Sequence, residues 1–201
     1  MVHCLAGDRY GEKGFAIGPI LLIVAILAVL TMAFASSNNS FTVSSSSQSN
    51  KVVASTVMGQ GSDMRTAADR VISNGFLITD VTYTGAATQA DLFSVAGGGT
   101  AQPIPPAQAL TSTSNNYSFI TTAKMNGVGT AGAASLAVVL PIKQAICQQV
   151  DDVLFSNSTV PTATASANSL DLTGAAAAQG WQEGCIQSGG VYYYFKLLVP
   201  A

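Results

Sequence analysis

The sequence predicts an α+β protein in which a long hydrophobic helix at the N-terminus precedes a smaller head of helices and strands. Three observations support this prediction. Phe15–Ala35 carries no charged side chain, residues 51–74 repeat apolar side chains at helical spacing, and Val191–Val199 is rich in aromatic and β-branched residues. We therefore expect four regions, which are residues 1–14, the hydrophobic helix 15–35, a Ser/Asn-rich linker at 36–50 and the head at 51–201.

The composition limits the classes of function. The chain of 201 residues is 48% hydrophobic and only 9% charged, with a formal net charge of -2. Soluble domains usually have about one charged residue in four, so this composition favours a membrane-associated or exported protein. A broad basic surface for nucleic acid is not compatible with the net charge, and we predict no specific nucleic-acid partner.

The hydrophobic run has the length of a membrane span. As an α-helix, Phe15–Ala35 would extend roughly 31 Å, which is about the thickness of a hydrocarbon core. Pro19 fits the first turn of a helix, where no amide hydrogen is needed, so we expect the regular helix to begin there. The alternative is a buried core helix, but a core helix of this length usually has a polar stripe, and this run has none.

The residues directly before this run resemble a class III signal peptide of the type IV pilin and pseudopilin superfamily. They are Glu12, Lys13, Gly14 and Phe15. The resemblance implies that residues 1–14 are a leader peptide, that a prepilin peptidase cuts after Gly14, and that Phe15 becomes the methylated mature N-terminus. Glycine suits a scissile position because it lets the backbone enter a tight cleft.

One position departs from the family pattern. The fifth mature residue is usually glutamate in major pilins, whereas here it is Pro19. The departure indicates a minor pilin, a pseudopilin-like subunit or a divergent filament type.

The resemblance also implies a function and a location. The chain would be a structural subunit of a type IV pilus-like filament on a bacterial or archaeal cell surface, held in the inner membrane before assembly. Its partners would be copies of itself, the prepilin peptidase and the pilus assembly machinery. In this family the amphipathic half of the N-terminal helix packs on a small antiparallel sheet.

A second route of processing leads to a different class of protein. Ala33, Phe34 and Ala35 form an A-x-A-like cleavage site at the end of the hydrophobic run. Cleavage after Ala35 would release residues 36–201. The alternative function is therefore a secreted or membrane-anchored binding domain that stays monomeric.

The cysteines predict one disulfide. Either cleavage would remove Cys4 and leave Cys147 and Cys185 outside the cytoplasm, where a disulfide persists. The bridge would join a helix that Pro141 opens and Phe155 ends to the turn before the last strand. Pilins have a similar disulfide near the C-terminus.

The head is expected to contain two helices and several strands. The apolar face of the first helix, residues 51–74, consists of Val53, Val57, Met64, Ala68 and Val71, with a kink at Gly59 and Gly61. In the second helix, the apolar face consists of Ile142, Ile146, Val150, Val153 and Leu154. The expected strands are 76–83, 117–122, 134–140 and 191–199, and residues 156–180 are expected to be a long loop.

No set of residues predicts catalysis. The single histidine, His3, lies in the predicted leader, so the mature chain has no Ser-His-Asp or Cys-His arrangement. Two cysteines without histidine are too few ligands for zinc. Asp151 and Asp152 are adjacent, do not converge on a helix, and are expected to face solvent. We therefore predict no enzyme activity, no cofactor and no metal.

Overall fold

The computed structural model describes residues 46–129 and 135–200. Nearly all of these residues belong to one compact unit, Gln48–Ala201. The predicted leader and hydrophobic helix, residues 1–35, lie outside the described residues.

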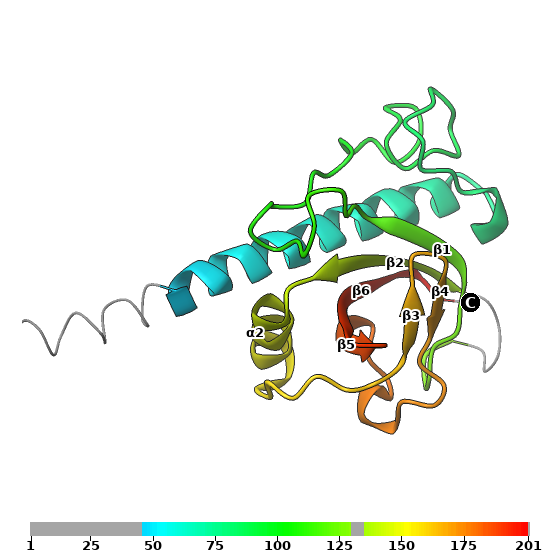
Figure 1. Ribbon diagram of the computed structural model, residues 1–201. Helices are drawn as coiled ribbons and strands as arrows, with labels where there is room; N and C mark the ends of the chain where they lie inside the picture. The colour runs from blue at the N-terminus through cyan, green and yellow to red at the C-terminus, as the bar shows by residue number, and fades with distance from the viewer. Residues whose placement is uncertain (1–45, 130–134, 201) are drawn as a thin grey trace, which may run out of the picture. The chain divides into compact units, whose positions relative to one another are not determined.

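Helix α1 is described over residues 46–73 (Figure 1). Its predicted apolar face is confirmed, because all five predicted residues are buried: Val53, Val57, Met64, Ala68 and Val71. The helix continues without a break through Gly59 and Gly61, where the sequence predicts a kink. Tertiary packing of the apolar face outweighs the weak helix propensity of these glycines. Residues 46–50, predicted as linker, are also helical.

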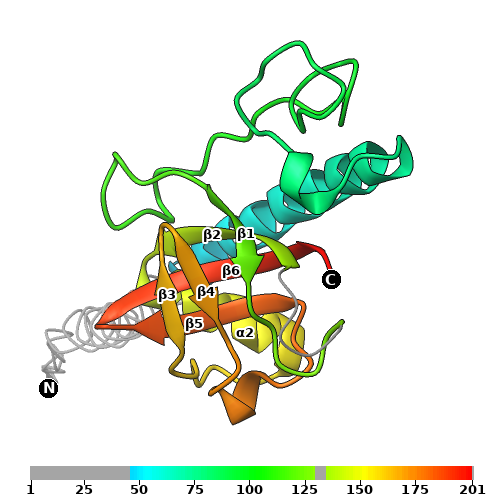
Figure 2. The same cartoon turned by 90° about the vertical axis from the view of Figure 1, so that its right-hand side faces the viewer.

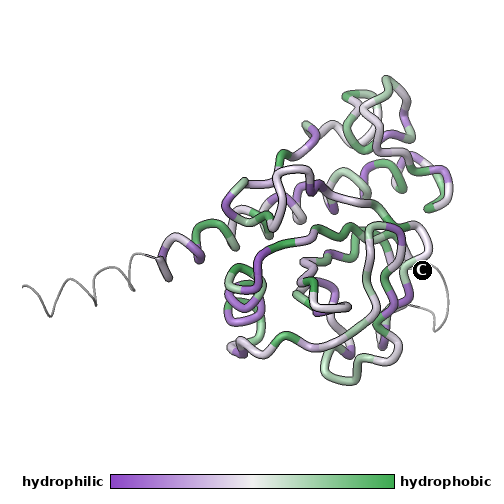
Figure 3. The backbone as a smooth tube through the Cα atoms, viewed as in Figure 1, coloured by the Kyte–Doolittle hydropathy of each residue, from purple (hydrophilic) through white to green (hydrophobic). Residues whose placement is uncertain are grey.

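The sheet has four antiparallel strands in the order β1-β2-β6-β5. Their bounds are β1 Ser118–Ala123, β2 Ser135–Ile142, β5 Glu183–Ser188 and β6 Val191–Val199. The predicted last strand is confirmed residue for residue, and the strands predicted at 117–122 and 134–140 are confirmed within two residues. The two central strands are β2 and β6, and β2 appears mostly in the hydrophobic colour of Figure 3.

Both helices pack on the same face of the sheet. Helix α2, Gln144–Phe155, lies behind β5 in Figure 2. Val57 of α1, Ile146 of α2 and Tyr194 of β6 share one buried cluster. The predicted α+β architecture is therefore confirmed, with a long helix packed on an antiparallel sheet.

A short hairpin covers the opposite face of the sheet. Strands β3, Thr164–Ser166, and β4, Ser169–Asp171, lie in front of the sheet in Figure 2. Leu170 and Leu172 are buried there against Phe195. The prediction that residues 156–180 form a long loop is therefore wrong. Strands of three residues rich in Ser, Thr and Ala have too little apolar periodicity to be found in sequence.

The hairpin is also bonded to both edges of the sheet. On one side the Lys124 amide, just after β1, donates to the Leu170 carbonyl at 2.9 Å. On the other side the Ala163 amide donates to the carbonyl of Gln187 in β5 at 3.0 Å. Unpaired strand edges promote association with other chains, and these bonds cover part of each edge.

The strand predicted at residues 76–83 is wrong. Ile78–Asp80 form a short 3-10 helix, η1, and Thr82 makes only an isolated bridge to Asp91. The Leu77 amide donates to the Asp80 carboxylate at 3.3 Å, which closes the turn locally. Phe76 and Ile78 pack against a buried cluster formed by residues of α1, β2 and β6. The segment therefore contributes to the core without joining the sheet.

Pro141 does not open a helix. It lies in β2 opposite Tyr193, and α2 begins after Lys143, whose backbone is extended. The last residue of β2 that pairs with β1 is Val139. Pro141 lies two residues beyond Val139, where β1 no longer pairs with β2. Although proline lacks an amide hydrogen, no hydrogen bond to β1 is lost, which explains how a central strand tolerates proline here.

Candidate functional site

The processing site predicted from the sequence is not part of the described structure. Gly14, Phe15 and Pro19 all lie outside the described residues. Within residues 46–129 and 135–200, no helix is long and apolar enough to cross a membrane.

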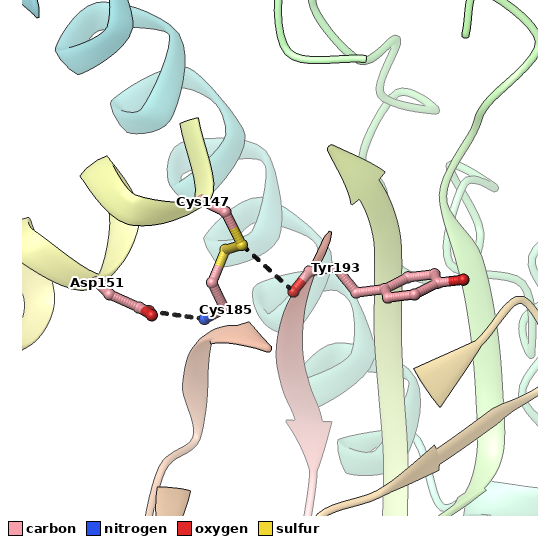
Figure 4. The surroundings of a disulfide bond; sticks show 4 residues. All are labelled: Cys147, Asp151, Cys185 and Tyr193. Atoms are coloured by element: carbon pink, nitrogen blue, oxygen red, sulfur yellow. Dashed lines mark hydrogen bonds between the residues drawn. A yellow bond between two sulfur atoms is a disulfide. The ribbon is translucent and has the colours of Figure 1, made fainter. Parts of the chain in front are cut away.

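The predicted disulfide is formed. Cys147 in α2 and Cys185 in β5 are bonded, with their Cα atoms 5.4 Å apart and a sequence separation of 38 (Figure 4). Both residues are fully buried. Cys185 pairs with Tyr194 inside β5, so its predicted place in a turn is wrong. The bond therefore joins a helix directly to the sheet.

Asp151 is a buried carboxyl group next to the disulfide. It lies one helical turn after Cys147, and its Oδ1 accepts a hydrogen bond of 2.8 Å from the Cys185 amide (Figure 4). Its Oδ2 is buried and has no hydrogen-bond partner among the residues that the structure describes. Burial raises the pKa of Asp151 to about 7, against a smaller lowering by the Cys185 amide. The prediction that Asp151 faces solvent is wrong, because α2 turns this side chain toward β5, whereas Asp152 is exposed as predicted.

The C-terminal turn of α2 carries an exposed apolar surface. Val153 and Leu154 were predicted to belong to the buried face, but they are 54% and 37% exposed. Phe155 stacks on Trp181 with ring centroids 3.8 Å apart. The buried face of α2 ends at Val150 and Asp151.

A partly buried polar network lies between α1 and the sheet. Lys196 of β6, which is 7% exposed, forms an ion pair with Glu183 of β5. The Lys196 Nζ also donates to the Ser62 hydroxyl of α1 at 3.2 Å. The Tyr194 hydroxyl donates to Glu183 Oε1 at 2.8 Å. Burial raises the pKa of Tyr194, and the Glu183 carboxylate raises it further, so the hydroxyl keeps its proton and acts as donor.

This network requires glycine at position 61. A Cβ atom on Gly61 would lie 2.1 Å from the Tyr194 hydroxyl oxygen. The helix can therefore approach the sheet at this point only because no side chain intervenes. A Cβ atom on Gly59, one half-turn away, would meet nothing within 4 Å.

Two further hydrogen bonds join α1 to its surroundings. The Tyr117 hydroxyl donates to Gln60 Oε1 at 2.7 Å, and Arg65 Nη1 donates to Gln182 Oε1 at 2.8 Å. Together with Ser62 they set the rotation and axial position of α1 on the sheet, because each bond is directional. The sequence contained one signal for this network, which is a lysine inside the otherwise apolar strand 191–199.

Two shallow clefts open on the surface of the head. One, of about 320 Å³, is lined by Gln60, Asp63 and Met64 of α1 and by residues 100–103. The other, of about 440 Å³, lies beside β3 and β4 and is lined mainly by threonines and Asp171. Hydrogen bonds from the Thr173 hydroxyl and amide lower the pKa of Asp171, so it is a carboxylate at neutral pH. The Thr173 hydroxyl donates to Asp171 Oδ1 at 2.6 Å, but the lowered pKa makes this carboxylate a weak base for activating a hydroxyl.

The described residues contain no group of three or more His, Cys, Asp or Glu that could hold a metal ion. Comparison of the chain with protein-family models, with curated proteins and with solved structures finds no match. Function must therefore be argued from the chain itself.

Proposed function

We propose that this chain is a structural subunit of a type IV pilus-like extracellular filament. The hydrophobic segment 15–35 would hold the precursor in the inner membrane and would then pack against the same segment of other copies. Lipid and neighbouring helices are alternative apolar environments for this segment, so it can leave the membrane without exposure to water. The head would form the outer surface of the filament.

One observation carries the proposal. It is the order of three features along the chain. A charge-free segment begins at the predicted cleavage site between Gly14 and Phe15, and a helix whose apolar face packs on an antiparallel sheet follows it. A disulfide lies near the C-terminus. The disulfide is consistent with export from the cytoplasm, where thiols are kept reduced.

The rival function is a secreted or membrane-anchored binding domain that stays monomeric. The Ala33-Phe34-Ala35 sequence supports it, because cleavage there would remove the hydrophobic segment.

Two measurements separate these functions. The intact mass of the mature protein gives its N-terminus, and negative-stain electron microscopy of the same material shows whether filaments are present. A mass that begins at methylated Phe15, together with filaments, is the expected result. A mass that begins at Ser36, with single particles, would support the secreted domain instead. A mass that begins at Met1 would indicate a simple membrane anchor.

A substitution at the junction gives a matched test. Gly14→Val should block processing because a β-branched side chain does not fit where glycine is required, and the precursor should remain in the membrane. Gly18→Val changes a glycine outside the junction and should leave the cleavage position unchanged.

A further inference from the structure

Three Asn-X-Ser/Thr tripeptides occur in the sequence, and two of them lie in the described structure. They begin at Asn116 and Asn157, and the third, at Asn38, lies outside the described residues. This tripeptide, with any residue except proline in the middle, is the acceptor motif for N-linked glycans in exported proteins. The structure distinguishes the two described sites.

Asn157 lies on an exposed segment that directly follows α2. The helix ends at Ser156, which adopts a left-handed backbone conformation with φ of 53°. Residues 156–159 are all exposed and belong to no helix or strand. An enzyme can therefore reach both the amide of Asn157 and the hydroxyl of Thr159 without opening the fold.

The backbone of this segment already holds the motif in a compact turn. The Thr159 amide donates to Asn157 Oδ1 at 2.9 Å, which is the bond of an Asx turn. This turn brings the first and third residues of the motif together. The hydrogen bond also stabilises negative charge on Oδ1, which develops when the amide nitrogen gives up a proton.

Asn116 has the same motif in an unsuitable setting. Its Oδ1 accepts from the amide of the next residue, Tyr117, and not from Ser118. Ser118 is the first residue of β1 and pairs with Val139. The Tyr117 side chain is held by its bond to Gln60. Formation of the Asx turn here would break the start of the strand.

We infer that Asn157 is an N-glycosylation site and that Asn116 is not. Asn157 Nδ2 would attack the anomeric carbon of an oligosaccharide carried on a polyprenyl phosphate or diphosphate. The new bond joins Nδ2 to this carbon, the bond from the carbon to the phosphate oxygen breaks, and the lipid phosphate leaves with the electron pair. The amide nitrogen loses one proton to a base of the transferring enzyme.

The inference rests on the proposed function in one respect, which is that the head must cross the membrane to meet such an enzyme.

The sugar would lie next to the exposed apolar turn of α2. Val153, Leu154 and Phe155 are partly open to water there, and a hydrophilic glycan beside them would reduce unwanted association.

Mass spectrometry of the protein purified from the cells that naturally produce it tests the inference. Cleavage after Phe155 and Trp181 isolates a peptide with Asn157, and a second peptide reports on Asn116. The state of Cys147 and Cys185 is measured in the same sample, because a disulfide reports export. We expect sugar on Asn157, no sugar on Asn116 and an intact disulfide.

Two neighbouring substitutions provide the matched control. Thr159→Ala destroys the motif and should abolish the modification, whereas Ser158→Ala preserves the motif and should leave it unchanged. Both positions are exposed, so neither substitution should affect folding.

Three results would overturn the inference. An unmodified Asn157 does so whatever the state of the cysteines. If the disulfide is formed in that sample, the proposed export is not affected, and if the cysteines are reduced, the proposed function fails too. Modification that persists in Thr159→Ala, or that maps to a hydroxyl group, would show a different chemistry.

Discussion

At the scale of single residues, Asp151 is the least well satisfied group in the described head. One oxygen accepts a hydrogen bond from Cys185 and the other has no partner. A buried polar atom without a partner costs free energy of folding, and a charge there costs more. The cost therefore depends on whether the carboxyl group carries a proton.

Asp151 should make the stability of the head depend on pH. Burial raises its pKa from 3.8 to about 7 in the folded state. Below about pH 4 the Asp151 carboxyl group is protonated in both the folded and the unfolded protein. Between about pH 4 and 7 it is protonated only in the folded protein. The free energy of unfolding should therefore fall across this interval, by at most about 4 kcal/mol, and stay level above it.

Asp151→Asn removes this titration. The variant should be more stable than the natural protein at pH 8 and should lose the fall between pH 4 and 7, as measured by urea unfolding across this range. Asp152→Asn is the control, because that side chain is exposed. An unchanged pH profile in Asp151→Asn would contradict the assignment.

Gly61 offers a second prediction at this scale. Gly61→Ala should destabilise the head by about 1–3 kcal/mol, because the new methyl group collides with the Tyr194 hydroxyl. Gly59→Ala should stabilise it by up to about 1 kcal/mol, because alanine is the better helix former and has free space. Thermal unfolding of both variants measures the difference. Equal effects at the two positions would contradict the close approach of α1 to the sheet.

At the scale of elements, the β3–β4 hairpin forms one side of the core although each strand has only three residues. Leu170 and Leu172 cover the face of the sheet opposite the helices. Central strand β2 consequently has buried residues on both faces, which explains its continuous apolar sequence.

Truncation of Leu170 tests the role of the hairpin. Leu170→Ala should lower the free energy of unfolding by about 2–5 kcal/mol, because it leaves a cavity against Phe195. Leu154→Ala, the same change on the exposed turn of α2, should cost about 0.5 kcal/mol or less. Denaturant unfolding measures both. A small effect at Leu170 would mean that the hairpin does not contribute to the core.

At the scale of the whole molecule, Gln48–Ala201 form a compact unit of their own. This unit contains all but the first two described residues of α1, together with the sheet, the hairpin and the disulfide. It has its own buried core, which is the physical requirement for independent folding.

A fragment of residues 48–201 should therefore fold alone and stay monomeric. Circular dichroism during heating should show one cooperative transition, and sedimentation should give the mass of a single chain. The full chain is the control and should form filaments after processing, because only it has segment 15–35. Filaments of the fragment would contradict the proposed role of that segment.

The sequence by itself determined the long periodic elements. The α1 face, the last strand and the pairing of Cys147 with Cys185 are all predicted, because periodicity over many residues and the two cysteines left after the expected cleavage are signals in the sequence itself. The resemblance at Gly14 and Phe15 also came from sequence, and it remains a prediction.

Only the tertiary structure decided how short or ambiguous segments are used. Residues 76–83 have strand composition but form a 3-10 helix and an isolated bridge, and Pro141 belongs to a strand because β1 ends before reaching it. Asp151 is buried where α2 packs on β5, and Lys196 is buried where α1 packs on the sheet. In each case the outcome depends on partners distant in the chain, and no local pattern of residues contains that information.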